Sequence, residues 1–270
     1  MKRENQTDAR TSAVPAVLKN LLCASVVAAL GAFAPAQATV LTFENVQNVV
    51  TSALKDGDTI YNTGDQFMDQ HFLLQVQSSS TADAGEVGFV GAQIQSNNDF
   101  ACLITACPAD GDGAYYAGLN DGSVRITSTL ANSWFRLQGL SFAFVAPVQG
   151  LVNFSYGRLI LSGTTSANDK ITNSFDFPGQ NASGAFVFSD LAVDNAFSSA
   201  VLTSLTINAC LFDGDVCQTD HQLTQNQAQF AVDNINLAEV PEPATIGLML
   251  MGVAGLTAAR RRKASNKGSN

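Results

Sequence analysis

Short stretches of alternating hydrophobic and polar residues follow one another between residues 39 and 239. The stretch "SVRITS" places Val124 and Ile126 on one face, and "WFRLQGLSFAFVA" does the same with Phe135 and Leu137. A period of two is typical of half-buried β-strands, and the Gly, Asn, Asp and Ser clusters between the stretches are typical of turns. We therefore expect an all-β ectodomain, an antiparallel β-sandwich of jelly-roll type.

Two glycines coincide with changes of phase in this pattern. At Gly139 the alternation slips by one position, and Leu140, Phe142 and Phe144 then continue it. We expect a β-bulge or a bend there, because an extra residue in one strand shifts the alternation. The stretch "LVNFSYGRLILSG" predicts a strand with Val152, Phe154 and Tyr156 on one face and a second change of phase near Gly157.

The two ends of the chain have a different pattern. An apolar run at 20–33 follows Lys19, and small residues Ala36 and Ala38 come after it, so we expect a signal peptide cleaved after Ala38. A second uncharged run at 244–259 would reach about 24 Å as a helix, close to the ~30 Å of a bilayer core. The predicted organisation is a signal peptide (1–38), a β-sandwich ectodomain (39–239), a sorting signal with a transmembrane helix (240–263) and a cytoplasmic tail (264–270).

The C-terminal segment resembles a known sorting signal. The matching residues are Pro241, Glu242 and Pro243, then the apolar run, then Arg260, Arg261 and Arg262. Together they resemble the PEP-CTERM signal of Gram-negative bacteria, and an ordinary tail anchor is the alternative. The resemblance implies the Sec export machinery and exosortase as partners, anchoring in the inner membrane before processing, and location at the cell surface or outside the cell afterwards. It also implies an association with exopolysaccharide or biofilm.

A narrower resemblance precedes this signal. In "QFAVDNINL", Gln229, Phe230 and Asp233 are similar to the QFxxD stretch of one subgroup of PEP-CTERM proteins. The resemblance implies export and sorting and assigns no activity to the ectodomain.

Charge is distributed unevenly along the chain. Both ends are basic, whereas residues 39–240 contain five Lys and Arg residues against twenty Asp and Glu residues. Nucleic-acid binding requires basic side chains that neutralise phosphates. An acidic ectodomain therefore argues against a nucleic-acid partner.

Four cysteines remain after the predicted signal peptide: Cys102, Cys107, Cys210 and Cys217. An even number in an exported chain favours disulfides. Of the three possible connectivities, Cys102–Cys107 with Cys210–Cys217 closes the shortest loops. A tetrahedral zinc site is the alternative, although zinc ligands are usually spaced more closely.

Acidic turns offer a candidate calcium site. "DGDG" and "DGD" supply Asp110, Asp112, Asp213 and Asp215, and each turn adjoins a cysteine pair. Carboxylate and carbonyl oxygens are the ligands that calcium prefers. Calcium is thus the one candidate cofactor, and the alternative is that Asp-Gly simply forms tight turns.

The segment Gln95–Ser123 predicts a long loop at one end of the sandwich, because turn-forming residues occur throughout it. Tyr115 and Tyr116 in this segment, with Trp134, are the candidate ligand-binding aromatics. Asp194 and Asp233 lie at or near strand ends, and we expect them to accept backbone hydrogen bonds rather than take part in catalysis.

Enzymatic activity has little support in the sequence. The chain has two histidines, His71 and His221, and lacks a nucleophile elbow, a P-loop and an H-E-x-x-H motif. We therefore expect a non-enzymatic surface or extracellular matrix protein. The alternatives are a carbohydrate-binding module, with or without calcium, and a hydrolase whose carboxylates meet only in three dimensions.

Overall fold

The computed structural model describes residues 38–50, 53–55, 58–78, 89–96, 99–109, 111, 113–131, 133–213, 216–218, 228–241, 252 and 255. The chain divides into two compact units, and the larger, Ala36–Glu242, is the one described below. The predicted signal peptide before Ala38 and the predicted transmembrane helix, except for Gly252 and Gly255, lie outside the described residues. Within the described part of the chain, no helix has the length and apolar character needed to cross a membrane.

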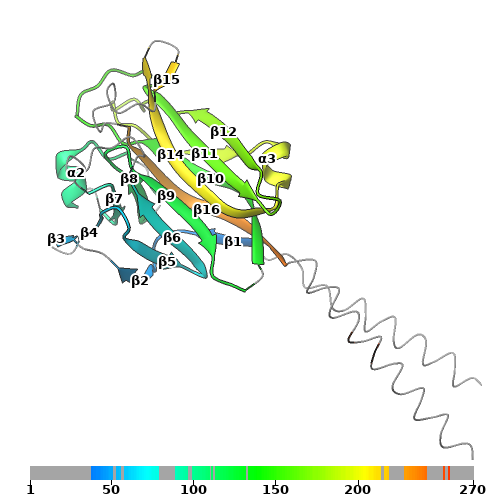
Figure 1. Cartoon of the computed structure of the whole chain (residues 1–270). Coiled ribbons are helices and arrows are strands. Elements are labelled where there is room, and N and C mark those ends of the chain that lie inside the picture. The colour runs from blue at the N-terminus through cyan, green and yellow to red at the C-terminus, as the bar shows by residue number, and fades with distance from the viewer. Residues whose placement is uncertain are drawn as a thin grey trace, which may run out of the picture. The chain divides into compact units, whose positions relative to one another are not determined.

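The described strands form one antiparallel sheet that folds over into two layers (Figure 1). The first layer contains β2 (Gln47–Val50), β5 (Gln66–Asp69), β6 (Phe72–Gln77), β9 (Ser123–Ser128), β14 (Leu202–Asp213), β11 (Gly157–Thr165) and β12 (Lys170–Asp176), with β15 (Val216–Gln218) paired to β14. The second contains β13 (Ser189–Ala192), β10 (Ser133–Phe144), β16 (Phe230–Pro241), β1 (Ala38–Leu41), β8 (Tyr115–Gly118), β7 (Gly91–Ile94), β4 (Asp58–Tyr61) and β3 (Ala53–Lys55). The helices are α2 (Phe100–Ile104) and α3 (Asn195–Ser199).

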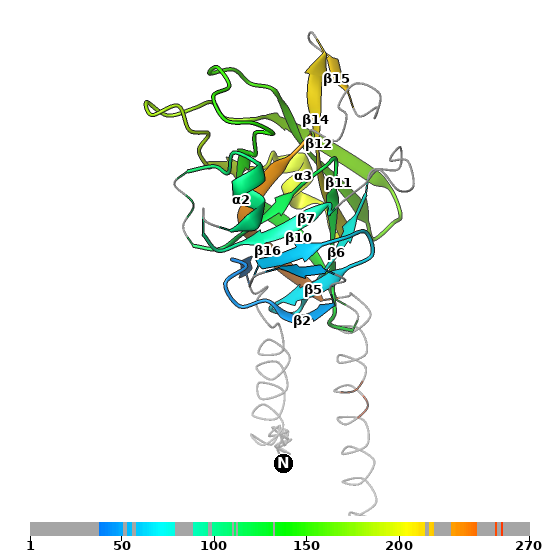
Figure 2. The same ribbon diagram turned by 90° about the vertical axis from the view of Figure 1, so that its left-hand side faces the viewer.

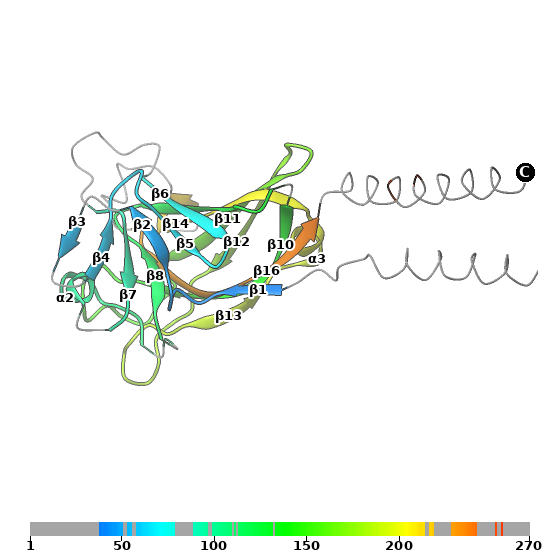
Figure 3. The same cartoon turned by 90° about the horizontal axis from the view of Figure 1, so that it is seen from below.

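The two layers are continuous at one corner. There β10 pairs with β14 through Phe135 and Leu202. Strand β16 pairs with β10 along one edge, and its other edge pairs with β8 near its start and with β1 near its end (Figure 3). The all-β, antiparallel prediction is therefore confirmed, and the finer jelly-roll connectivity stays a prediction.

Alternation along the strands places the core where the sequence predicts it. Val124 and Ile126 of β9 are fully buried. In β10, the register with β16 shifts on both sides of Gly139, which confirms the predicted irregularity at this glycine. A Cβ atom at this position would lie 2.6 Å from the Leu191 carbonyl oxygen of β13, so the close approach of β13 requires glycine.

A core rich in phenylalanine fills the space between the layers. At one end of it, Phe43, Tyr61, Phe67, Tyr116 and Phe230 form a continuous aromatic cluster, in which Tyr61 and Phe67 stack with centroids 4.8 Å apart. Burial of such large side chains is the main favourable contribution to folding.

A second, smaller core lies on the other face of β7 and β8, on the side of α2 (Figure 2). Ala101 and Cys102 of α2 pack against Tyr115 and Ala117 of β8. Because both faces of these strands are covered, all four residues of β7 and all four of β8 are buried. These strands therefore lack the alternation from which a strand is predicted.

Two expectations are wrong: one predicted a loop and the other predicted a strand. The segment Gln95–Ser123 contains α2 and β8, so it is not a continuous loop. The predicted strand around Val152 and Phe154 is also absent: both side chains are exposed, and the strand begins only at Gly157. Of the residues of this stretch before Gly157, Leu151 and Tyr156 pack against the core.

Candidate functional site

A polar groove of about 680 Å³ lies on the outer face of the first layer. It crosses β9, β14, β11 and β12, with the end of β6 and the β8–β9 turn at its border. Its lining is dominated by hydroxyl and amide side chains: Gln77, Ser78, Ser123, Ser162, Thr164, Thr172, Ser204, Thr206 and Asn208. The groove therefore offers many hydrogen-bond donors and acceptors on a regular sheet.

Strand register arranges these side chains in rows. Thr206 of β14 pairs with Arg125 of β9 on one side and with Ser162 of β11 on the other, and Ser162 pairs with Thr172 of β12. Directly opposed residues in a sheet place their side chains on the same face. One row of polar side chains thus crosses four strands, and neighbouring strands lie about 4.8 Å apart.

The next row brings a second basic side chain to the groove. Thr164 of β11 pairs with Ser204 on one side and with Lys170 on the other. Arg125 and Lys170 are both exposed and line the groove, together with one carboxylate, Asp121. Alternation predicted the buried face of β9, but only the register shows that the polar faces of these strands form one surface.

The candidate aromatic platform is not at the surface. Tyr115 is 4% exposed and Tyr116 is fully buried, and they point to opposite cores. Burial raises the pKa of both phenols, and Asp99 adds to the rise for Tyr115. Trp134 is half-buried in β10, where it pairs with Val240 of the neighbouring strand β16. The assignment of the two tyrosines to ligand binding is therefore wrong, because a ring that stacks on a sugar must be exposed.

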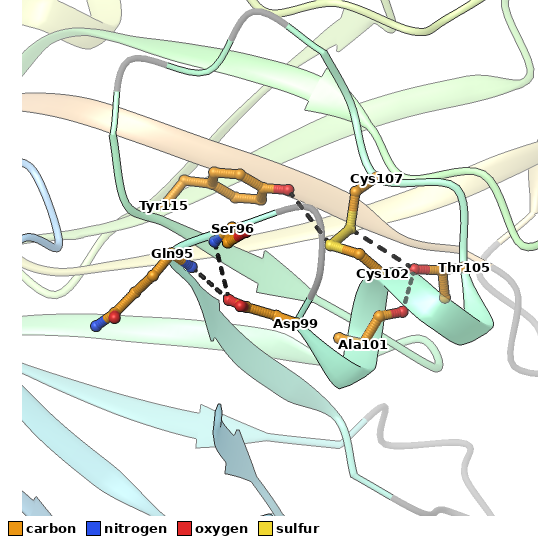
Figure 4. Close-up of a disulfide and its surroundings, with 8 residues drawn as sticks. All are labelled: Gln95, Ser96, Asp99, Ala101, Cys102, Thr105, Cys107 and Tyr115. Carbon is orange, nitrogen blue, oxygen red and sulfur yellow. Dashed lines mark hydrogen bonds between the residues drawn. A yellow bond between two sulfur atoms is a disulfide. The ribbon is translucent and has the colours of Figure 1, made fainter. Parts of the chain in front are cut away.

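Both predicted disulfides are present. Cys102–Cys107 joins α2 to the segment after it, with Cα atoms 5.2 Å apart, and Cys210–Cys217 joins β14 to β15, with Cα atoms 5.7 Å apart. The first lies near the Tyr115 hydroxyl, 4.0 Å from Cys102 Sγ (Figure 4). The Asp99 carboxylate accepts hydrogen bonds from the backbone N–H groups of Gln95 and Ser96 and so fixes the turn before α2.

Of the four aspartates predicted to bind calcium, the structure describes one. Asp213 is exposed at the end of β14, whereas Asp110, Asp112 and Asp215 lie outside the described residues. Among the described residues, no group of three or more His, Cys, Asp or Glu side chains is placed to hold a metal ion. Calcium at these turns stays a prediction.

Two aspartates accept backbone hydrogen bonds, as the sequence predicts. Asp194 caps α3, with Oδ1 accepting from the Phe197 N–H at 2.6 Å. Asp233 is buried in β16, and its Oδ1 accepts from the N–H of Asn234 at 2.7 Å, where Asn234 has a positive φ of 50°. Both are structural residues.

The sorting segment begins inside the last strand. Strand β16 continues to Pro241, which pairs with Ser133 of β10. Two residues earlier, Glu239 contacts His71 and accepts a hydrogen bond of 3.1 Å from the Thr39 hydroxyl. Glu242, Pro243 and the arginines Arg260, Arg261 and Arg262 lie outside the described residues.

Comparison with known proteins agrees with this segment. Residues 239–263 match the family described as the PEP-CTERM protein-sorting motif. A comparison with curated proteins gave no match.

Several solved structures resemble the chain weakly. A mutant of the family 29 carbohydrate-binding module CBM29-2 is 11% identical, covering 77% of this chain and 89% of the module, with a TM-score of 0.29. A cyclase from Fischerella sp. TAU is 12% identical, covering 76% and 99%, with a TM-score of 0.35. TmCBM61, solved in complex with β-1,4-galactotriose, is 7% identical, covering 63% and 88%, with a TM-score of 0.30. These scores are too low to support an argument about function. What the comparisons do give is a PEP-CTERM motif at residues 239–263, which implies export and sorting with exosortase as the processing partner.

Proposed function

We propose that this chain is a non-enzymatic bacterial surface or extracellular matrix protein associated with exopolysaccharide. The observation that supports it most directly is that the sorting motif starts at Glu239, within the last strand of a compact β ectodomain. Such an arrangement suits a folded cargo that is anchored during export and then released or attached outside the cell. We also assign the chain to the QFxxD subgroup, whose Gln229, Phe230 and Asp233 are here buried residues of the β16 region.

The groove suits binding better than hydrolysis. Glycoside cleavage usually requires two carboxyl groups on opposite sides of the scissile bond. Among the described residues that line the groove, Asp121 is the one carboxylate, and its Oδ1 accepts a hydrogen bond from the Ala228 N–H at 3.0 Å. The hydroxyl and amide side chains of the groove can bind and orient a ligand through hydrogen bonds.

Intact mass of the exported protein tests the sorting function. We expect a mature chain that starts at Thr39 and lacks Arg260–Arg262 in cells that contain an exosortase, and a chain that keeps these arginines in cells that lack it. Glu242→Gln is a matched variant that changes the motif without altering its apolar run. A mature protein that keeps the arginines in exosortase-containing cells would contradict the proposal.

The alternative function, a carbohydrate-binding module, is favoured by the groove itself. Its volume of about 680 Å³ lies within the range of small-ligand and oligosaccharide sites, roughly 300–1,000 Å³. A pull-down with insoluble polysaccharides is its simplest test. Retention by none of a broad panel would leave the sorting function standing and remove this alternative.

A further inference from the structure

We propose that the groove binds an acidic polysaccharide, one whose sugar units carry carboxylate or sulfate groups. The inference rests on the proposed carbohydrate-binding role and names the class of ligand. It starts from the placement of charge: only five Lys and Arg residues occur between residues 39 and 240, against twenty Asp and Glu residues. Two of those five, Arg125 and Lys170, line the same groove.

Among the described residues, no carboxylate lies within ion-pair distance of either of these two cations. In the part of the chain that the structure describes, the ion pairs are His71–Glu239 and Arg158–Asp176. Arg158 is thus paired outside the groove, whereas Arg125 and Lys170 are exposed and have no ion-pair partner within the described residues. Cations that line a groove of an otherwise acidic protein, and that have no ion-pair partner among the described residues, favour an anionic ligand.

The spacing of the cations fits a polymer better than a small anion. Arg125 lies on β9 and Lys170 on β12, three strand steps apart in the order β9, β14, β11, β12. At about 4.8 Å per step, their Cα atoms are separated by roughly 14 Å across the strands. A chain of linked sugars with repeated acidic groups can contact both cations along the groove.

The neutral part of the lining selects sugars among polyanions. Between the two cations lie Ser162, Thr164, Ser204 and Thr206, whose hydroxyls both donate and accept hydrogen bonds. Sugar hydroxyls need such partners, whereas an acidic peptide would need pockets for its side chains. Among the described lining residues none is aromatic, so a neutral sugar has no ring to stack on and gains less than a charged one.

The test compares three probes with the full chain at about 0.15 M salt, where a Debye length of about 8 Å screens the distant carboxylates. The probes are polygalacturonate, the neutral polymer dextran, and polyaspartate, which is acidic but carries no sugar. Arg125→Gln with Lys170→Gln is the test variant. Lys55→Gln with Arg158→Gln is the matched control. It removes two positive charges, one from β3 in the second layer and one from Arg158, which does not line the groove.

We expect polygalacturonate to bind the native chain, and the test variant to bind it about tenfold more weakly, because contacts between charged groups are the strongest hydrogen bonds of such a site. The control variant should bind within about twofold of the native chain, and both variants should keep the native melting temperature within a few degrees. Equal binding of polyaspartate would overturn the carbohydrate class. Dextran binding that is equally tight and insensitive to the test variant would overturn the acidic class but not the carbohydrate-binding role. Binding of neither glycan would overturn both, while the mass of the exported protein would still test sorting independently.

Discussion

Several polar groups lie within the aromatic core, and Tyr116 is the most completely enclosed. Its ring contacts Phe43, Phe67 and Phe230, and its hydroxyl has no hydrogen-bond partner among the described residues. Burial raises the pKa of this phenol well above its ordinary value, so it stays neutral at physiological pH. A neutral, enclosed hydroxyl without a partner contributes no favourable hydrogen bond and is costly to desolvate.

Tyr116→Phe should therefore leave the free energy of unfolding unchanged or raise it by up to about 1 kcal/mol. The ring stays, so the contacts with Phe43 and Phe230 are kept. Urea unfolding of the full chain followed by fluorescence measures the change. A decrease of more than about 1 kcal/mol in the free energy of unfolding would show that the hydroxyl has a stabilising partner. A loss of polysaccharide binding would show that Tyr116 contributes to ligand binding after all.

Asp69 holds the chain at Phe43, and its titration should be visible in stability. Its side chain is 1% exposed, and Oδ2 accepts from the Phe43 N–H at 2.8 Å, where Phe43 has a φ of 58°. Burial raises the pKa of Asp69, and hydrogen bonds from the backbone of Phe43, Thr42 and Gln70 offset only part of that rise.

A raised pKa means that the folded state binds the Asp69 proton more tightly than the unfolded state. The free energy of unfolding should then decrease as pH rises from about 3.9, the ordinary aspartate value, through the raised pKa. Asp69→Asn removes this titration, so the stability of the native chain minus that of the variant should fall over the same interval. Urea unfolding at several pH values between about 4 and 8 measures it. A difference that stays constant or rises with pH would contradict the assignment.

At the scale of elements, the sequence predicts a strand well when one face is covered and poorly when both are. Strand β9 and the first half of β10 bury one face, and their alternation and the irregularity at Gly139 were predictable. In β8 the neighbours Tyr115 and Tyr116 enter different cores, so the stretch reads as a polar loop with two tyrosines. The groove was not predictable, because the cross-strand register that aligns Arg125 with Thr206 is a property of the folded sheet.

The two disulfides should differ in their effect on α2. Cys102 belongs to the second core beside Tyr115, whereas Cys217 lies in the short strand β15, at the top of Figure 1, next to exposed Val216. Replacing Cys102 and Cys107 by Ser should lower the free energy of unfolding by about 2 kcal/mol or more, because a short cross-link is lost and polar atoms enter the core.

Replacing Cys210 and Cys217 by Ser is the matched comparison, with a loop of similar length. Cys210 is fully buried, so this replacement should also lower the free energy of unfolding, but it should not loosen α2. Hydrogen exchange should show increased opening of residues 99–105 only in the Cys102/Cys107 variant. Increased opening in both variants, or in neither, would mean that the first disulfide does not hold α2 on the sheet.

At the scale of the whole ectodomain, the two predicted processing sites are brought together by one pair of strands. Ala38, the last residue of the predicted signal peptide, pairs with Ala238 near the end of β16. Glu239 then contacts both Thr39 and His71. The predicted end of the signal peptide at Ala38 and the predicted end of the ectodomain at Glu239 therefore both fall within paired strands. Residues near a processing signal can thus also complete the sheet.

This pairing predicts which side of Pro241 the exosortase cuts. The backbone up to Pro241 is paired with β10, and its other edge is covered by β1 as far as Ala238. A peptide bond held in a sheet between two strands cannot enter the active site of a processing enzyme without breaking those hydrogen bonds. The mature chain should therefore end at Pro241 or later. Mass spectrometry of its C-terminal peptide gives the last residue, and the chain from cells without exosortase is the control. A mature chain that ends before Pro241 would show that β16 opens before sorting, and would contradict the view that exosortase acts on the folded ectodomain.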